Sequence, residues 1–517
     1  MPSTPARTPD KPATPRPTDR PTALLSAGAL AAFVAVSLVW PDRSAAAIST
    51  GFSWSARWFG AGWQLLLLAT WVVAVLLALT PWASARLGTL APQFPRFQWV
   101  AMIMCTLLAG GGVFWAAAEP MYHYTSTPPL FAGSGLDAAH VALAQSFTDW
   151  GFLAWAVLGS LGAIVLLYAH ERGMPLRPRS LLFPVLGHRA NGRVVGTAVD
   201  VVCIVAVVAG TVGPLGFLGL QVAYGLDHLG LAPNSYPVQL AVIVTLALVA
   251  LVSVLTGLDR GIQVLSRVNV WVALALAAAV VALGSVGFVL RAWLGGLAVY
   301  ATHFVPMATF TADQAWSASW TVFFYAWFLG YGPLMSIFIA RISRGRSIRD
   351  LVVNTAIVPP LVTTLWFSAL GGTGIWIETG EPGAISEPLA EGGLPASVVA
   401  IADHLPAGTA LVVAFLLLTM TFVATTTDSM SYAVAQACTR HGMPSPLFRG
   451  LWVVLMATAA AVLISLGGGG ISALQSFIVI TAVPVGFILL PSVVAAPVFA
   501  RRLHAEQRAL AAAGEAD

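Results

Sequence analysis

A stripe of aromatic side chains inside one apolar segment is the first feature of the sequence that could do chemistry. Within residues 320–333, four rings recur at a helical period and share one face: Phe324, Trp327, Phe328 and Tyr331. Another apolar segment supplies Trp150 and Trp155. Converging aromatic faces attract a quaternary ammonium group, which carries a positive charge but no N–H donor. The alternative is that these rings anchor helices at a membrane interface or pack against lipid.

Helix-weakening residues interrupt two apolar segments near their centres. Segment 98–118 contains Gly110, Gly111 and Gly112, and the aromatic segment contains Gly330, Gly332 and Pro333. Glycine weakens a helix by about 1 kcal/mol and proline by about 3 kcal/mol. Interrupted helices at matching positions of two repeats mark the binding site in many transporters. The pattern predicts two helix breaks, and the alternative is that the glycines let helices pack closely.

The composition indicates which elements must position these residues. Of 517 residues, 58% are hydrophobic and 9% are charged, against about 25% charged in soluble domains. This excludes a soluble enzyme, a disordered protein and a nucleic-acid binder. Twelve apolar segments are long enough to span a bilayer, which takes about 20 residues. They are 22–40, 61–81, 98–118, 148–169, 195–220, 236–257, 269–290, 319–340, 351–371, 406–435, 450–467 and 472–499.

The arginines and lysines orient these segments. With a cytoplasmic N-terminus, 22 of the 25 basic residues fall on the inside, and only Arg43, Arg57 and Arg291 fall outside. We therefore expect an all-α polytopic protein of the inner (cytoplasmic) membrane with both termini cytoplasmic. Residues 1–21 are expected to be a disordered tail, 22–500 the twelve-helix domain and 501–517 a short tail. No long C-terminal osmosensing helix is expected.

The two interrupted segments are the third and the eighth, five apart. An odd offset inverts the second repeat, so helices 3–7 and 8–12 are predicted to form a 5+5 inverted repeat with two extra N-terminal helices. The nine histidines form no catalytic or metal-binding set, and no phosphate-binding loop is present. We expect neither an enzyme nor an ATP-driven pump, and no cofactor. A membrane sensor or a passive channel stays a remote alternative.

Four ordered motifs resemble the betaine/choline/carnitine transporter family across all twelve segments. They lie at residues 114–124, 257–266, 320–349 and 425–429. The resemblance implies a leucine-transporter-type fold, a homotrimer in the lipid bilayer, and secondary transport of glycine betaine, choline or carnitine. Members of the family are sodium symporters, proton symporters or exchangers, and some carry sulfonium compounds. An amino acid is a further alternative substrate.

The resemblance also assigns a substrate cage. It places Trp150, Trp155, Trp327, Phe328 and Tyr331 at cage positions, with Tyr325 at an upstream aromatic position. The family's helix-4 tyrosine falls on Leu158, and two helix-8 tryptophans become Phe328 and Tyr331. Asp149 stands where the family often has histidine. A carboxylate there would favour a net cation such as choline, and the alternative is a helix N-cap at the outer interface.

The same resemblance implies a sodium site, the one metal ion expected. Thr425 and Thr426 match the family's adjacent helix-10 hydroxyls, and helix-3 carbonyls near Cys105 and Leu108 would complete the site. The family's helix-3 glycine pattern is only partly kept. We expect sodium symport, with proton symport and exchange as alternatives. Threonine hydroxyls in a helix also bond to the preceding turn, which is the non-functional interpretation.

Overall fold

The computed structural model describes residues 18–88, 91–108, 112–256, 259–440, 442–468 and 471–514. Over these residues the chain is helical, and its only β structure is two isolated bridges, Thr18 with Thr439 and Arg86 with Ser347. The predicted all-α class is therefore confirmed for the described part. Residues 1–17 of the predicted tail lie outside it, as do Gly110 and Gly111.

The helices of the first half run as follows: α1 Arg20–Val39, α2 Pro41–Leu79, α3 Arg96–Leu108, α4 Gly112–Thr125, α5 Ala138–Trp150, α6 Phe152–Gly159, α7 Leu161–His170, α8 Phe183–Leu186, α9 Arg193–His228, α10 Tyr236–Thr256 and α11 Asp259–Leu283. The second half contains α12 Val286–Thr302, α13 Phe304–Ala308, α14 Gln314–Ser319, α15 Thr321–Ile342, α16 Ile348–Ala356, α17 Val358–Gly380, α18 Ser386–Gly392, α19 Ala396–Asp403, α20 Gly408–Ala437, α21 Pro446–Leu466 and α22 Ser472–Gly514. Short 3-10 turns join several of them.

Ten of the described helices or near-continuous helix runs are long and apolar enough to cross a membrane. An eleventh span would be the pair formed by residues 267–283 and 286–302, which is bent by 107°. The predicted span 269–290 is therefore wrong in its last part, because the chain turns at residues 284–285 and α12 leaves at an angle. The predicted span 98–118 falls on α3 and α4, with residues 109–111 between them outside the described part.

The fourth predicted segment is one span built from three helices. α5 ends at Trp150, α6 begins at Phe152, and α7 follows after Ser160. Gly151 makes the first break possible, since a Cβ there would lie 2.2 Å from the carbonyl oxygen of Phe147. Only glycine lets the chain turn this tightly against the preceding helix. The break fixes the direction in which the Trp150 side chain leaves α5.

The predicted break at Gly330, Gly332 and Pro333 is wrong. α15 is one helix from Thr321 to Ile342, with Pro333 inside it. The glycines instead allow close packing: a Cβ on Gly332 would lie 2.8 Å from Leu489 of α22. Neighbouring helices make a proline tolerable inside a membrane helix because they surround the freed backbone groups. The alternative interpretation, glycines at a helix–helix contact, is the one that holds for α15.

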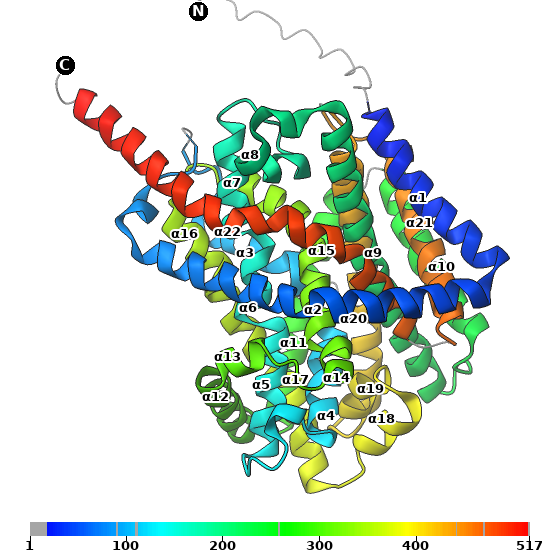
Figure 1. Cartoon of the computed structure of the whole chain (residues 1–517). Coiled ribbons are helices and arrows are strands. Elements are labelled where there is room, and N and C mark those ends of the chain that lie inside the picture. Colours follow the sequence, from blue (N-terminus) through cyan, green and yellow to red (C-terminus); the bar gives the residue numbers. More distant parts are fainter. Residues whose placement is uncertain are drawn as a thin grey trace, which may run out of the picture.

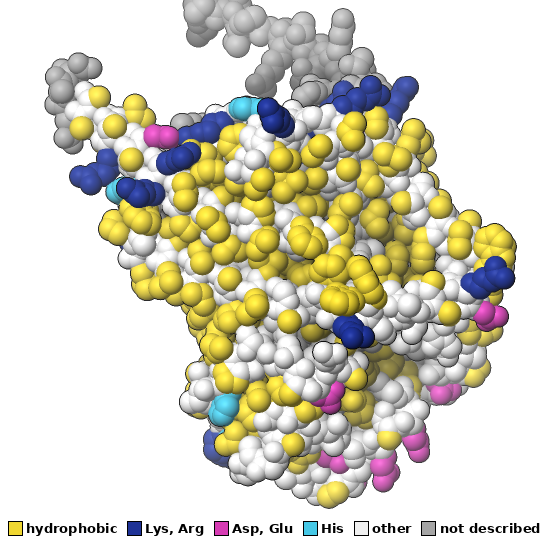
Figure 2. Space-filling view, viewed as in Figure 1, with side chains coloured by type: hydrophobic (Ala, Val, Ile, Leu, Met, Phe, Trp, Pro, Cys, Tyr) yellow, Lys and Arg dark blue, Asp and Glu magenta, His cyan; other side chains and the backbone are white. Residues whose placement is uncertain are grey.

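Two long helices cross the bundle side by side, α2 and α22 (Figure 1). α15 packs against both, and also against α6 and α9. α4, α5, α12 and α17 pack against one another and, with α18 and α19, lie at the end of the bundle opposite the start of α1 (Figure 1). Arginine side chains gather at the end where the termini lie, and acidic side chains gather at the opposite end (Figure 2). α22 passes residue 501 without interruption and ends at Gly514.

Candidate functional site: an aromatic cluster beside a deep cavity

Five helices bring aromatic rings together around Trp150, the last residue of α5. The ring centroids of Phe324, Trp327, Phe328 and Phe367 lie 5.3, 5.7, 5.5 and 5.3 Å from that of Trp150. Three of these rings come from α15 and one from α17. Trp115 of α4 and Phe217 of α9 extend the cluster, with Trp115 4.9 Å from Phe324 and Phe217 5.7 Å from Trp327.

Two of the three tryptophans of the cluster, Trp150 and Trp327, are held by their indole N–H groups, whereas the N–H of Trp115 has no partner among the described residues. Trp150 Nε1 donates to Glu119 Oε2 at 2.8 Å, and Trp327 Nε1 donates to the carbonyl of Gly210 at 3.1 Å. Gly210 lets α15 approach α9 closely, because a Cβ there would lie 2.9 Å from Tyr331. Buried indole groups need such partners. The hydrogen bonds therefore fix which ring faces point into the cluster.

The structure brings together three of the predicted cage residues, Trp150, Trp327 and Phe328. The other three aromatic side chains make no ring–ring contact with this group among the described residues, although Tyr331 lies next to Trp327 at Gly210. Trp155 donates to Thr363 Oγ1 at 2.9 Å, Tyr325 to the carbonyl of Thr148 at 3.4 Å, and the Tyr331 hydroxyl lies 3.5 Å from that of Thr211. Trp115, Phe217 and Phe367 were not among the predicted cage residues, because they lie on α4, α9 and α17, outside the two segments that suggested the cage. Phe324 is part of the predicted aromatic stripe of α15, although the resemblance assigns it no cage position.

Asp149 lies in the last turn of α5 and is fully buried. It is no helix cap at an interface, because Asp137 caps α5 and accepts from the backbone N–H of His140. Gln145 Nε2 donates to Asp149 Oδ2 at 3.1 Å. The carboxylate thus stands directly beside the aromatic cluster, next to Trp150 in the chain.

Asp149 is one of three buried titratable groups that meet behind Trp150. Glu119 and His123 of α4 are the others, and one ligand atom from each lies within 4.8 Å of the rest. Among the described residues this is the only set of three His, Cys or carboxylate groups so close together. The sequence shows Glu119 and His123 one helical turn apart, but nothing in it predicts that Asp149 joins them.

A cavity of about 960 Å³ lies on the side of the bundle that carries the arginines. α15 contributes Leu334 and Met335, one turn beyond Tyr331, and α17 contributes Trp366. Arg177, Arg341 and Arg449 line it as well. None of the predicted cage residues lines this cavity, and Trp150, Trp327 and Phe328 are buried, at 3%, 5% and 3% exposed.

Both threonines predicted to bind sodium line the cavity. Thr425 Oγ1 donates to the backbone carbonyls of Thr421 and Phe422, which is the back-bonding expected of a helical threonine. Thr426 Oγ1 is buried and has no hydrogen-bond partner among the described residues. A buried hydroxyl without a partner fits a cation ligand. The predicted partners Cys105 and Leu108 end α3, and their side chains lie outside the described residues.

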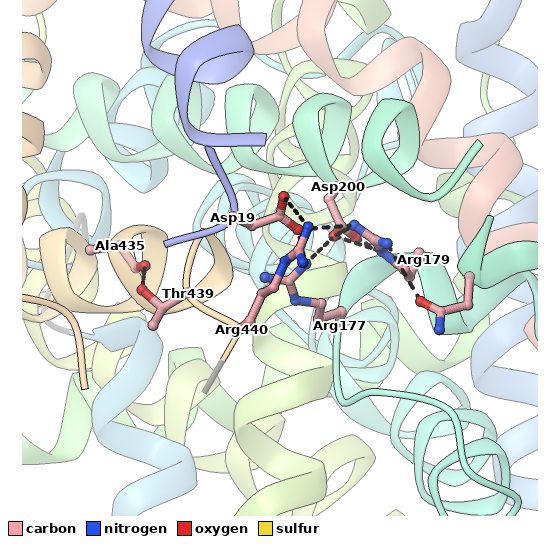
Figure 3. Close-up of polar contacts among 8 residues, drawn as sticks. Asp19, Arg177, Arg179, Asp200, Ala435, Thr439 and Arg440 are labelled. Atoms are coloured by element: carbon pink, nitrogen blue, oxygen red, sulfur yellow. Dashed lines mark hydrogen bonds and ion pairs between the residues drawn. The ribbon is translucent and has the colours of Figure 1, made fainter. Parts of the chain in front are cut away.

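A network of buried ion pairs lies at the basic end of the molecule. Asp19 Oδ2 lies 2.6 Å from Arg177 Nη1, and Asp200 Oδ2 lies 2.6 Å from Arg179 Nη2. Figure 3 shows both carboxylates converging on these arginines, with Arg440 approaching Asp19. Burial raises the pKa of Asp19, but the Arg177 hydrogen bond and the nearby arginine charges outweigh it and hold this pKa below its ordinary value. The network ties the start of α1 to the segment after α7.

A second buried ion pair joins the 425–429 motif, which lies on α20, to α21. Arg449 Nη2 of α21 donates to Asp428 Oδ1 of α20 at 3.0 Å, and both residues line the cavity. Asp428 follows Thr425 and Thr426 on the same helix, so the ion pair holds the turn that carries those hydroxyls.

Comparison with known proteins agrees with this architecture. A family model described as the betaine/carnitine/choline family transporters (BCCT) matches residues 21–505. Glycine betaine transporter 2 of Vibrio parahaemolyticus is 45% identical over 486 residues, which cover 93% of this chain and 90% of that protein. The ectoine/hydroxyectoine transporter of Virgibacillus pantothenticus is 30% identical, covering 91% and 94%. The high-affinity choline transport protein of Escherichia coli is 33% identical, covering 68% and 52%. The matched span and these identities show that the chain belongs to the betaine/carnitine/choline family of membrane transporters.

Proposed function

We propose that this chain imports a quaternary-ammonium compound of the glycine betaine, choline or carnitine type by alternating access. The observation that carries the proposal is the cluster of Trp150, Trp327 and Phe328 beside a cavity of about 960 Å³. Membership in a transporter family and the substrates named for its relatives support it. An enzymatic function is excluded by the same family membership.

The cluster needs to open before it can hold a substrate. Its ring centroids lie only 5.3–5.7 Å apart. A cation held between two rings lies up to about 6 Å from each centroid, so the two rings must move farther apart to admit it. Because Trp327 and Phe328 lie on α15 and Trp150 on α5, a small movement of one helix against the other would separate the rings. The cavity on the basic side would then be the path by which the substrate leaves toward the cytoplasm.

Sodium is the coupling ion that we propose. Thr425 and Thr426 would hold it, together with backbone carbonyls at the end of α3, since hydroxyl and carbonyl oxygens suit a hard cation. A bound sodium ion would supply positive charge that joins α3 to α20. The unpartnered hydroxyl of Thr426 supports this proposal. Proton symport and exchange without a coupling ion are the alternatives.

We also propose the complete architecture: twelve membrane-spanning helices in a 5+5 inverted repeat, both termini cytoplasmic, in a homotrimer in the inner membrane. Breaks inside two spans five apart support the repeat. One break lies at Gly151 in the span α5–α7, and the other at Ile357 between α16 and α17. Cysteine labelling from each side of the membrane tests the orientation, and native mass spectrometry in detergent tests the trimer.

The deciding experiment is uptake of labelled choline and glycine betaine into proteoliposomes, with and without an inward sodium gradient at constant pH. Accumulation that depends on sodium supports the whole proposal. Uptake that does not depend on sodium, but depends on a proton gradient or on substrate inside the vesicles, would show proton symport or exchange instead of sodium symport. Failure to take up either compound, from protein shown to be folded, contradicts the substrate assignment.

A zwitterion without a quaternary nitrogen is the second candidate substrate. Two cage positions carry Phe328 and Tyr331 where the family resemblance implies tryptophan, and one relative is named as a transporter of ectoine and hydroxyectoine. Smaller rings leave more room for a cyclic substrate. Competition of unlabelled ectoine, a sulfonium analogue and an amino acid against labelled glycine betaine separates these classes.

A further inference from the structure

The carboxyl and imidazole groups that meet next to the Trp150 indole include polar atoms that have no hydrogen-bond partner among the described residues. Glu119, Asp149 and His123 are 0%, 0% and 1% exposed. Glu119 Oε2 is occupied by the Trp150 indole and Asp149 Oδ2 by the Gln145 amide. Glu119 Oε1, Asp149 Oδ1 and both His123 nitrogens have no hydrogen-bond partner in the described part of the chain. Four unpartnered polar atoms thus meet in one buried place.

Within the part of the chain that the structure describes, no arginine or lysine forms an ion pair with this acidic cluster. The described ion pairs connect it to no arginine or lysine, and its single ion-pair contact is internal, His123 Nε2 at 3.8 Å from Glu119 Oε1. The titratable groups that face it from packed helices are the phenols of Tyr300 on α12 and Tyr325 on α15. Charged groups of the packed helices lie elsewhere. Arg341 of α15 lines the cavity and Arg291 of α12 is exposed. Glu378 of α17 accepts from Gly383, Ile385 and Ser386, and Asp403 of α19 pairs with His228.

Two carboxylates this close cannot both stay ionised in a dry interior, because each repels the other and both lose hydration. The free oxygens and the imidazole therefore need a positive charge, and a proton satisfies them most simply. A hard metal cation prefers a full shell of oxygen ligands, and among the described residues only two unpartnered carboxylate oxygens are available here.

We propose that Glu119, Asp149 and His123 form a proton-binding site that is linked to the aromatic cage, so that a quaternary ammonium in the cage expels a proton from it. This inference rests on the proposed substrate class. The proton leaves a carboxyl O–H of Glu119 or Asp149 for the surrounding solution, and the carboxylate that remains attracts the positive charge of a substrate bound on the neighbouring Trp150 ring.

Trp150 provides the link between the two sites. Its ring belongs to the cage and its N–H is bonded to Glu119, so the cage and the cluster share one side chain. A cation on the face of that ring would lie about 8 Å from the carboxylate, and at an effective dielectric constant of about 20 it weakens proton binding about 30-fold. A zwitterion has a smaller effect because its own carboxylate offsets part of the charge.

The sign of the pH dependence follows from this linkage. Substrate binds better to the ionised cluster, so the affinity for choline rises as the pH increases. Because one proton is released, the affinity rises at most tenfold per pH unit. It stops rising at a pH where the cluster is already ionised before the substrate binds. Glycine betaine shows a shallower rise.

Calorimetric titration of choline into the full-length protein, in detergent with saturating sodium chloride, tests the inference. Running it in several buffers of different ionisation enthalpy at one pH counts the protons released. We expect up to one proton per choline bound, and fewer per glycine betaine. The variants Glu119→Gln and Asp149→Asn should release less, while Glu387→Gln, an exposed acidic residue changed in the same way, should match the wild type.

The outcomes separate the two proposals. Absence of any binding heat from folded wild-type protein contradicts the proposed substrate class and not the cluster. Binding without proton release, and with an affinity independent of pH, overturns the inference even if neither amide variant folds, since the wild type alone decides it. Proton release that persists in both amide variants assigns the proton to another group and also overturns it.

Discussion

Replacing Trp327 measures how much the aromatic cage contributes to substrate binding. The Trp327 ring lies 5.7 Å from Trp150, 5.7 Å from Phe217 and 5.6 Å from Phe323, and its N–H satisfies the carbonyl of Gly210. Trp327→Ala removes one desolvated cation–π contact of about 2 kcal/mol, which is about 30-fold in affinity. It also costs about 3–5 kcal/mol of stability by leaving a cavity.

Trp327→Phe separates these two effects. The smaller ring keeps an aromatic face, so we expect the affinity for choline to fall only about threefold. The carbonyl of Gly210 loses its partner, which costs about 1–3 kcal/mol of stability. Equilibrium binding of labelled choline to purified protein, with a thermal unfolding curve for each variant, provides both quantities.

Trp452→Phe is the matched control. Trp452 is fully buried in α21, its ring contacts Phe448 rather than the cage, and its N–H has no partner among the described residues. It should leave choline affinity unchanged. If folded Trp327→Ala protein binds choline as tightly as Trp452→Phe protein does, Trp327 does not line the substrate site and the cage assignment is refuted.

Three further predictions concern the ion sites. Arg449→Met removes the charged hydrogen bond that Arg449 donates to the Asp428 carboxylate, so thermal unfolding in detergent should show a loss of about 1.5–3 kcal/mol; an unchanged midpoint would argue that this pair contributes nothing to stability. Thr426→Ala removes a hydroxyl that has no hydrogen-bond partner in the described structure, so the melting temperature should hold while sodium-stimulated uptake disappears; uptake with normal sodium dependence would exclude Thr426 as a ligand. The Asp19 pKa lies below its ordinary 3.8, so its stabilising pair with Arg177 is fully present above that value and is lost only as the pH falls through the lower folded pKa. The protection of α1 against hydrogen exchange, measured relative to the intrinsic rate of the unfolded chain at each pH, should therefore be constant from pH 5 to 8, and Asp19→Asn should lower it at pH 7; equal protection in the two proteins would contradict this role.

Much of the fold could be predicted from the sequence because a bilayer restricts the chain so strongly. Backbone groups in a bilayer must be bonded within their own segment, so long apolar runs form helices whatever their neighbours are. The ends of the predicted segments 22–40, 236–257 and 406–435 lie within two residues of helix ends in α1, α10 and α20. The prediction failed where packing decides. Glycine and proline in α15 were expected to break the helix, but surrounding helices keep it whole.

The cage could be predicted in part, because the aromatic stripe of α15 and the position of Trp150 are both visible in the sequence. Which rings meet depends on helix rotation and on single hydrogen bonds. Trp155 and Tyr325 were predicted beside the substrate, yet Thr363 and the backbone of Thr148 bind their polar atoms away from the cluster. Such partners come from helices far away in the sequence, so no local pattern reveals them.

The sequence by itself determined that the protein is helical and embedded in a membrane, and which aromatic side chains share a face of α15. These properties depend on hydropathy and helical period, which are local. Only the tertiary structure decided that Glu119, His123 and Asp149 meet behind Trp150. Their meeting depends on how α4 lies against α5 and on the turn at Gly151. A few ångströms of helix displacement would separate these groups without changing any residue.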